Sequence, residues 1–290
     1  KAANGVIANN QGRKVKTLWT ANEEGEKVAY RKFQSAFEEA EFVALDISKK
    51  VNRGDCQYGD CAVLYRTNAQ SRLFEEKFLL SNIPYKLIGG INFYARKEIK
   101  DVLAYLKTID NARDDLAVRR IINVPKRGIG ATTIARVQEY AALQEMNFYD
   151  ALKNAAEVPG IGRGVAKTDP FVTFIQTLRS KAQVYSVMEL VNDLLEQTGY
   201  IRELEAEGTE EAKERIENIN ELINKVAAYE QKEDEPTLSG FLEEVALVAD
   251  VDSLEGDGSR VVLMTLHSAK GLEFPHVYMA GMEDGIFPSY

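Results

Sequence analysis

Short apolar runs without alternation are the clearest pattern along the chain. The clearest runs lie at residues 61–65 and 261–264, and further strand candidates lie at residues 85–88 and 276–280. A continuous run of this kind suits a strand that is covered on both faces, as in a parallel sheet, although periodicity alone does not exclude a buried helix. Helical periodicity flanks the strand candidates at residues 61–65 and 85–88, and it lies at residues 36–51, 70–80 and 96–109. This alternation of helices and strands predicts an α/β domain.

From about residue 110 to about residue 250 the pattern becomes mainly helical. We predict helices at residues 116–123, 131–143, 148–156, 170–185, 187–198, 212–230 and 238–249. The strand pattern returns only at Arg260, after a stretch rich in Asp, Gly and Ser at residues 250–259. An all-helical insert inside an α/β domain explains this order with one assumption. We therefore expect the α/β domain to occupy residues 1–109 and 255–290, with the insert at residues 110–254.

The N-terminal stretch predicts a short helix at residues 2–8 and a turn at residues 23–26 between two strands. No apolar run approaches membrane-spanning length, and the first residues lack the layout of a signal peptide. We therefore expect a soluble, cytoplasmic protein that makes no membrane contact. Because the chain begins with Lys1 rather than Met, we also expect it to be a piece of something longer.

Charge and cysteine content narrow the chemistry. The net charge of −9 argues against a whole surface that binds nucleic acid, but it allows a local basic patch. Cys56 and Cys61 are the only cysteines, and the two histidines are far from them in sequence. We therefore predict no metal site. Cys61 is expected to begin a buried strand, and Cys56 to be a free thiol in a reducing compartment.

A dense set of polar residues follows the run at residues 261–264. Residues 265–273 read TLHSAKGLE and supply hydroxyls, an imidazole, an ammonium, a glycine and a carboxylate. Open parallel sheets bind ligands beyond the carboxyl ends of their strands, so this loop is a candidate site for a phosphorylated ligand or a nucleic-acid backbone. The alternative is an ordinary polar loop with Ser268 as a cap and Lys270 in solvent.

The wider stretch TLHSAKGLEFPHV at residues 265–277 closely resembles motif V of the superfamily 1 DNA helicases of the UvrD/Rep/PcrA type. YRTNAQSR at residues 65–72 resembles motif IV of the same helicases. The resemblance implies an incomplete RecA-like parallel-sheet domain, the second of two, interrupted by an all-helical insert with turns like those of a helix-hairpin-helix. The Walker A loop, the Walker B acidic pair and a later arginine motif are missing from these residues. We expect them before Lys1 and after Tyr290.

The resemblance also assigns a nucleotide site. Arg66 would contact the γ-phosphate of ATP as the catalytic arginine, and Tyr65 would flank the nucleotide. Gly271 would let the backbone approach the nucleotide, and Glu273 would accept a hydrogen bond from the ribose. An arginine just beyond a buried strand can pair with phosphate oxygens in bidentate fashion, although an isolated arginine more often forms a surface salt bridge. The cofactors ATP and Mg²⁺ would be held mainly by the absent first RecA-like domain.

The expected DNA contacts lie in three stretches. In motif V, Thr265, His267 and Lys270 would link the nucleotide edge to the DNA strand, although His267 could instead be a core histidine. The stretch GGINFYARKEIKD at residues 89–101 resembles the segment that abuts single-stranded DNA, with Arg96 and Lys100 placed to meet phosphates. Within it, Phe93 and Tyr94 are expected in the core. Asn92 stands where relatives often carry a basic residue, which puts a phosphate contact there in doubt.

The third stretch is VPKRGIGATTIAR at residues 124–136, the most basic neighbourhood of the chain. Glycines between two helices permit close backbone approach, and N–H groups at a helix start can hold a phosphate. We expect duplex contacts at Lys126, Arg127, Gly128, Gly130 and Thr132. The alternative is an ordinary glycine turn.

Another glycine-rich stretch, at residues 160–168, looks like a phosphate-binding loop. It has Ala166 where a Walker A sequence needs glycine before its lysine, and no apolar strand precedes it. We interpret it as a second hairpin turn of the insert.

The sequence is compatible with two candidate functions. The first is part of an ATP-dependent 3′-to-5′ DNA helicase, whose partners would be single-stranded DNA, the single/double-strand junction and the absent first RecA-like domain. Regulatory proteins could bind its insert, and this piece alone would not hydrolyse ATP. The second is a non-catalytic DNA- or protein-interaction module on an α/β scaffold. A Walker A loop upstream in the natural reading frame would favour the helicase.

Overall fold

A computed structural model of the chain describes residues 5, 19–21, 25–251 and 258–287. The chain divides into two compact units, Lys1–Gln34 and Ser35–Tyr290. Within the first unit, the described residues 25–33 form no strand, so the strand expected after the turn at residues 23–26 is not found there. Most of the short helix expected at residues 2–8 and of the linker expected at residues 250–259 lies outside the described residues.

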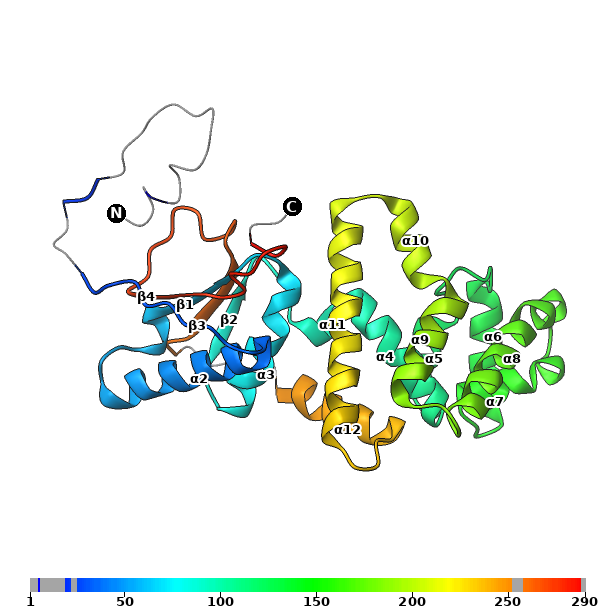
Figure 1. The fold of residues 1–290 in the computed structure, drawn as a ribbon. Helices are drawn as coiled ribbons and strands as arrows, with labels where there is room; N and C mark the ends of the chain where they lie inside the picture. Colours follow the sequence, from blue (N-terminus) through cyan, green and yellow to red (C-terminus); the bar gives the residue numbers. More distant parts are fainter. Residues whose placement is uncertain (1–4, 6–18, 22–24, 252–257, 288–290) are drawn as a thin grey trace. The chain divides into compact units, whose positions relative to one another are not determined.

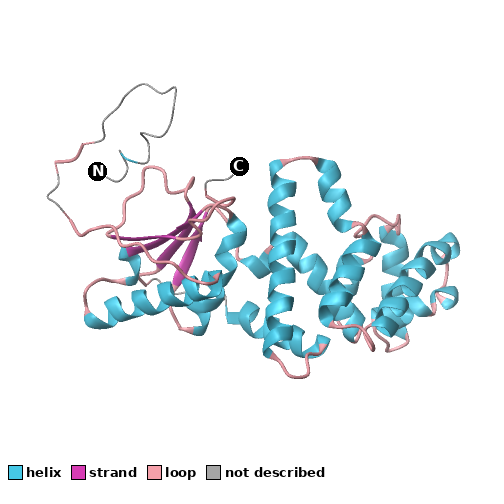
Figure 2. Ribbon diagram, viewed as in Figure 1, coloured by secondary structure: helices cyan, strands magenta, loops and turns pink. Residues whose placement is uncertain are grey.

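The second unit contains a sheet of four parallel strands in the order β2-β3-β1-β4. The strands are β1 (Cys61–Tyr65), β2 (Tyr85–Ile88), β3 (Val261–Thr265) and β4 (His276–Met279), and they are drawn in magenta in Figure 2. The four strand candidates of the sequence therefore are strands, and the predicted parallel α/β class is confirmed. β3 comes late in the chain but lies between β1 and β2, so the chain leaves the sheet after β2 and returns at its centre.

Two helices cover one face of the sheet (Figure 1). They are α2 (Ala36–Arg53) and α3 (Ser71–Leu80). α2 begins at Ser35, whose side chain accepts a hydrogen bond from the Glu38 N–H, and ends at Gly54 in the left-handed conformation. On the other face, Val262 and Met264 pack against Ala269 and Phe274 of the segment that follows β3.

The remaining elements are helices up to residue 251. The α-helices are α4 (Lys97–Asp110), α5 (Asp115–Ile121), α6 (Ala131–Leu143), α7 (Phe148–Lys153), α8 (Val165–Lys181), α9 (Val187–Thr198), α10 (Tyr200–Glu207), α11 (Glu210–Lys232) and α12 (Leu238–Val251). The bounds of α6 and α9 agree with the prediction. α8 begins before Pro170 rather than at it, so this proline lies inside the helix, where it removes one hydrogen bond between successive turns. α10 was not predicted.

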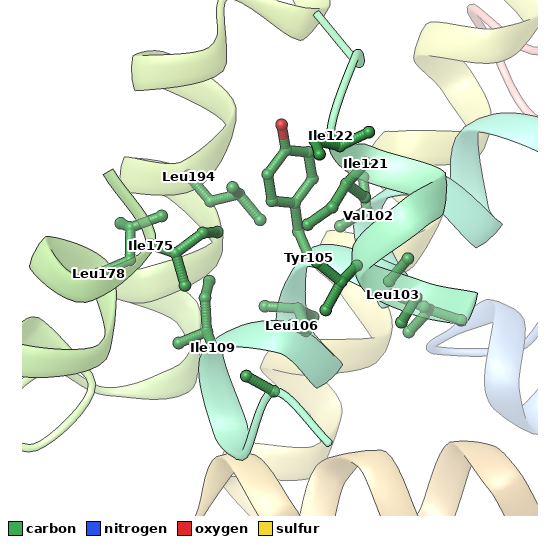
Figure 3. Packing of buried hydrophobic residues seen from close by; sticks show 14 of the residues in the cluster. Val102, Leu103, Tyr105, Leu106, Ile109, Ile121, Ile122, Ile175, Leu178 and Leu194 are labelled. Carbon is green, nitrogen blue, oxygen red and sulfur yellow. The ribbon is translucent and has the colours of Figure 1, made fainter. Parts of the chain in front are cut away.

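The core of the helical region is built around α4. Figure 3 shows side chains from several helices pointing toward one another, and its labelled residues include Tyr105, Leu106 and Ile109 of α4, Ile175 of α8 and Leu194 of α9. All five are buried. α4 therefore shares its core with the helices that follow it, while the predicted boundary at residues 109 and 110 stays a prediction.

Buried charges join α3 to the later helices. Arg72 forms ion pairs with Glu76 at 3.0 Å and with Glu221 of α11 at 3.1 Å. Lys225 of α11 lies 3.4 Å from Glu76 and 2.6 Å from Glu244 of α12. Buried charges are costly unless they are paired, so this network fixes α11 and α12 against α3 in one arrangement.

Candidate nucleotide and nucleic-acid site

The loops after β1, β2 and β3 meet at the carboxyl edge of the sheet. A Cβ on Gly89 would lie 3.0 Å from the Ser268 hydroxyl oxygen, and a Cβ on Gly90 would lie 3.4 Å from Asn68 Oδ1. Gly89 also has φ +75°, a conformation that favours glycine. The Gly89-Gly90 pair therefore lets the loop after β2 approach the two loops beside it.

Arg66 and His267 form the contact that links the two candidate motifs. Arg66 Nη1 lies 3.3 Å from His267 Nδ1. A guanidinium only donates hydrogen bonds, so Nδ1 is the acceptor and the neutral ring carries its proton on Nε2. His267 is exposed, which excludes the alternative of a core histidine. β1 and β3 are adjacent parallel strands with Tyr65 opposite Thr265, so the register itself brings these two residues together.

A glutamine that the sequence analysis missed holds the turn after β1. Gln70 Oε1 accepts hydrogen bonds from the backbone N–H groups of Arg66, at 2.8 Å, and Thr67, at 3.0 Å. Thr67 and Gln70 have the spacing of a capping box, in which the side chain of the later residue bonds the backbone at the helix start, and this spacing is the signal that could have identified Gln70. The two bonds fix the direction in which Arg66 leaves the strand.

The motif V loop is held by hydrogen bonds where it leaves β3, and its later residues are exposed. The Leu266 N–H donates to the Tyr65 carbonyl oxygen at 2.8 Å, and the Ser268 N–H donates to Thr265 Oγ1 at 3.2 Å. The hydroxyl of Thr265 thus closes the loop. The three predicted ligand residues beyond it are exposed, and they are Lys270, Gly271 and Glu273.

Tyr65 does not have the environment expected of a residue that flanks a nucleotide. It is 1% exposed and packs in the core beneath α2 and α3. Alternation along β1 places Tyr65 on the same face as Cys61 and Val63, which is the helix-covered face. Burial raises the pKa of the Tyr65 hydroxyl. The ring offers no open face to a base, so we correct its assignment to a structural one.

Arg96 also departs from its expected role. It is 5% exposed, and its guanidinium donates to Asn218 Oδ1 at 2.5 Å and to the Ser71 hydroxyl at 2.7 Å. It lies 3.7 Å from the Glu75 carboxylate. A side chain enclosed in this way has no access to a DNA phosphate, so the expected phosphate contact is corrected to an internal one.

Other residues of this stretch behave as predicted or stay open. Phe93 and Tyr94 are buried, which confirms the expectation that they belong to the core. The ring of Phe93 lies under the Arg96 guanidinium, 5.2 Å from centroid to Cζ. Lys100 is exposed on α4, where a phosphate could reach it.

The two glycine turns of the helical region lie side by side. Gly128 has φ +69°, and its carbonyl oxygen accepts a hydrogen bond from Lys167 Nζ at 2.9 Å. Arg136 Nη1 donates to the carbonyl oxygen of Gly160. The stretch at residues 160–168 enters α8 and follows a short helical turn rather than a strand, as expected of a second turn.

Around the first turn, the predicted contact residues divide into two groups. Lys126, Gly128, Gly130 and Thr132 are exposed, and Gly130 is the residue at which α6 begins. Arg127 points inward instead. Its Nη1 donates to the carbonyl oxygen of Ile121 at 2.9 Å, and its Nη2 donates to the Tyr105 hydroxyl at 2.7 Å.

Arg127 therefore serves the packing of the turn. Its guanidinium caps the carbonyl end of α5 and lies 5.1 Å from the centroid of the Phe171 ring. We correct its expected phosphate contact to a structural role. The sequence could not separate Lys126 from Arg127, because both are basic residues beside the same glycine.

This division predicts different outcomes for two adjacent substitutions. Arg127→Ala is expected to lower the free energy of unfolding by about 2 kcal/mol or more, because it removes charged hydrogen bonds to carbonyl groups. Lys126→Ala is expected to change it by no more than about 0.5 kcal/mol. Urea denaturation of both variants measures the difference. Equal stability of the two variants would contradict the inward placement of Arg127.

The sheet, its edge and the helical insert define a RecA-like α/β domain of the helicase type. Over residues 1–290 the chain matches the UvrD-like helicase C-terminal domain, and it belongs to that family. It is 42% identical over 294 residues to the ATP-dependent DNA helicase PcrA of Bacillus subtilis (strain 168), covering 99% of this chain and 40% of that protein. It is 46% identical over 290 residues to the ATP-dependent DNA helicase PcrA of Staphylococcus aureus (strain Mu50), with 99% and 39% covered.

The chain thus spans about two fifths of the length of these relatives, 40% of the first and 39% of the second. The resemblance drawn from motifs IV and V is confirmed at the level of the family. Among the described helices, none is long and apolar enough to span a membrane.

Proposed function

We propose that this chain is the second nucleotide-cleft wall and part of the DNA-binding surface of an ATP-dependent DNA helicase that moves 3′ to 5′ along one strand. The observation that carries the proposal is the contact between Arg66 and His267, 3.3 Å apart, at the edge where the loops after β1 and β3 meet. It connects the residue suited to a phosphate with the loop suited to a DNA strand. The relatives are named as ATP-dependent DNA helicases, which supports the same assignment.

On the nucleotide side, the arrangement suits a triphosphate at the carboxyl edge of the sheet. The half-buried guanidinium of Arg66 leaves a turn fixed by Gln70, so it is oriented before a ligand arrives. Preorganised donors of this kind stabilise the charge that develops in phosphoryl transfer. Gly271 and Glu273 are exposed in the loop after β3. There Gly271 would let the backbone approach the nucleotide, and Glu273 would accept a hydrogen bond from the ribose. ATP and its Mg²⁺ would be held mainly by a first RecA-like domain.

Coupling to DNA follows from the two partners that Arg66 can have. A guanidinium that turns toward a γ-phosphate would move from its present position, 3.3 Å from His267 Nδ1, and weaken that hydrogen bond. Binding of ATP would therefore release the imidazole, and hydrolysis would restore the contact. Because Thr265 and Lys270 belong to the same tied loop, a change at His267 would reach the residues expected to meet the DNA strand.

The helical insert would contact the duplex ahead of the single strand. Lys126, Gly128, Gly130 and Thr132 form an exposed group at the start of α6, where backbone N–H groups have no partner within the helix. Lys100 offers a further ammonium on α4. Contacts of this kind recognise the DNA backbone and its shape rather than a base sequence. A DNA contact confined to such a small group of residues is compatible with the net charge of −9.

The proposal is tested with the protein made from the complete natural reading frame. It is expected to hydrolyse ATP in the presence of single-stranded DNA and to unwind duplexes with a 3′ tail in preference to those with a 5′ tail. The 290-residue chain alone is expected to show no ATP turnover. Equal unwinding of both substrates would contradict the direction of movement. Turnover by the isolated chain that Arg66→Ala abolishes would contradict the need for a second domain.

A further inference from the structure

The two cysteines lie close together at the opposite end of β1 from Arg66. Cys56 Sγ and Cys61 Sγ are 3.8 Å apart. Both are thiols in this structure, Cys56 partly exposed and Cys61 buried. The sequence alone does not indicate that the two side chains meet, because a spacing of five residues does not by itself bring them together.

The local backbone explains why they meet. α2 ends at Gly54, whose left-handed conformation (φ +78°) turns the chain back toward the sheet. A single short helical turn, Tyr58–Asp60, then separates the two cysteines, and it is closed by the Gln57 N–H, which donates to Asp60 Oδ2 at 2.8 Å. Cys61 is the first residue of β1 and is paired with His276 of β4, whereas Cys56 lies in irregular backbone.

We propose that Cys56 and Cys61 form a reversible thiol–disulfide modification site that reacts with small disulfides. A disulfide needs its sulfurs about 2.05 Å apart, so the pair must close by roughly 1.8 Å from its present separation. Rotation of the Cys56 side chain, with a small movement of its irregular segment, can supply this approach while Cys61 stays in the strand. The chain has no third cysteine that could form a disulfide with either of them within one molecule.

The reaction has two exchange steps. The Cys56 thiol loses its proton to solvent, and its thiolate attacks one sulfur of a small disulfide RSSR, forming a mixed disulfide and releasing RS⁻. The Cys61 thiol then loses its proton in turn, and its thiolate attacks the Cys56 sulfur and releases the second RS⁻. Both leaving thiolates take up protons, so two protein thiols and RSSR give one protein disulfide and two RSH. The protein sulfurs are oxidised by two electrons and RSSR is reduced by two.

Exposure sets the order of the steps. Cys56 is the accessible sulfur, while Cys61 has no exposed surface. Burial raises the pKa of the Cys61 thiol, and its hydrogen bond with Cys56 acts in the same direction. A small disulfide therefore meets Cys56 first, and Cys61 resolves the mixed disulfide from within the protein. Reduction by excess RSH reverses the same path.

The test uses a tryptic peptide that contains both sulfurs, residues 54–66, bounded by Arg53 and Arg66. The folded chain is incubated with oxidised glutathione, acid-quenched and alkylated with iodoacetamide under denaturing conditions. We expect this peptide to lose both alkyl labels and to become lighter by two hydrogens than its reduced form, and to regain both labels after treatment with reduced glutathione. In Cys61→Ala, the glutathione adduct should instead persist on Cys56.

Several results would overturn the proposal. They are a stable glutathione adduct on Cys56 of the unaltered chain, full labelling of both cysteines after oxidation, and a disulfide that links two chains. Because the readout is the mass of the unaltered chain, it does not depend on whether a variant folds. It is also independent of the proposed helicase activity, since the cysteines lie at the amino end of β1 and Arg66 follows its carboxyl end.

Discussion

Arg66→Ala in the complete protein is expected to lower kcat for DNA-stimulated ATP hydrolysis by about 10³-fold or more, the range measured for arginines that stabilise a transferring phosphoryl group. The expectation depends on the position of Arg66 directly after β1, on a turn held by two hydrogen bonds to Gln70. Such a guanidinium binds the charge that develops as the phosphoryl group departs, so the loss should fall on kcat more than on KM. Steady-state kinetics at saturating DNA measures both constants.

Two comparison variants sharpen this prediction. Arg66→Lys keeps the positive charge but loses the planar fork, so it should recover only part of the lost rate. Arg53→Ala removes an exposed arginine at the end of α2, away from the carboxyl edge, and should leave kcat unchanged. An Arg66→Ala enzyme with kcat within a few-fold of the parent enzyme would remove Arg66 from the nucleotide site.

The substitution is not expected to disturb the fold. The motif V loop stays attached to β1 through the backbone bond from the Leu266 N–H to the Tyr65 carbonyl oxygen, which does not involve the Arg66 side chain. The lost contact to His267 should appear instead as weaker stimulation of hydrolysis by DNA. A circular dichroism spectrum and a melting temperature like those of the parent enzyme would separate the catalytic effect from unfolding.

The sheet could be predicted from the sequence because its strands carry a local signal. Each of the four strand candidates is short and contains β-branched or aromatic residues, and each is a strand in the structure. The meeting of Arg66 and His267 could be predicted in part, since both follow parallel strands and such strands present their carboxyl ends at one edge. Their direct contact needed the strand order, in which β3 lies beside β1.

Arg96 and Tyr65 differ from their predicted roles because both side chains are enclosed by other parts of the fold. Arg96 pairs with Asn218, which is 122 residues later, and no local pattern indicates such a partner. Tyr65 stands next to Arg66 in a motif, yet alternation along β1 turns it into the core. Motif resemblance identifies which residue types occur together, whereas burial decides which of them remain available to a ligand.

Arg96→Ala is expected to reduce the free energy of unfolding by about 3–5 kcal/mol, the usual cost of removing one partner from a buried ion pair. The truncation would leave the buried Glu75 carboxylate without its guanidinium neighbour at 3.7 Å and Asn218 Oδ1 without its donor. The loss should be large because these groups lie where α3, α4 and α11 meet, so water cannot readily replace the missing donors. Urea denaturation followed by circular dichroism measures it.

Lys100→Ala is the matched control, because Lys100 lies on the same helix but is exposed. Its stability should stay within about 0.5 kcal/mol of the parent protein, as for most surface substitutions, while its affinity for single-stranded DNA falls. The opposite pattern, a stable Arg96→Ala protein that has lost DNA affinity, would return Arg96 to the DNA surface and contradict the buried network. If both variants behave as expected, the basic residues of this stretch divide between folding and binding according to their exposure, which is the division that we also predict for Lys126 and Arg127 in the glycine turn.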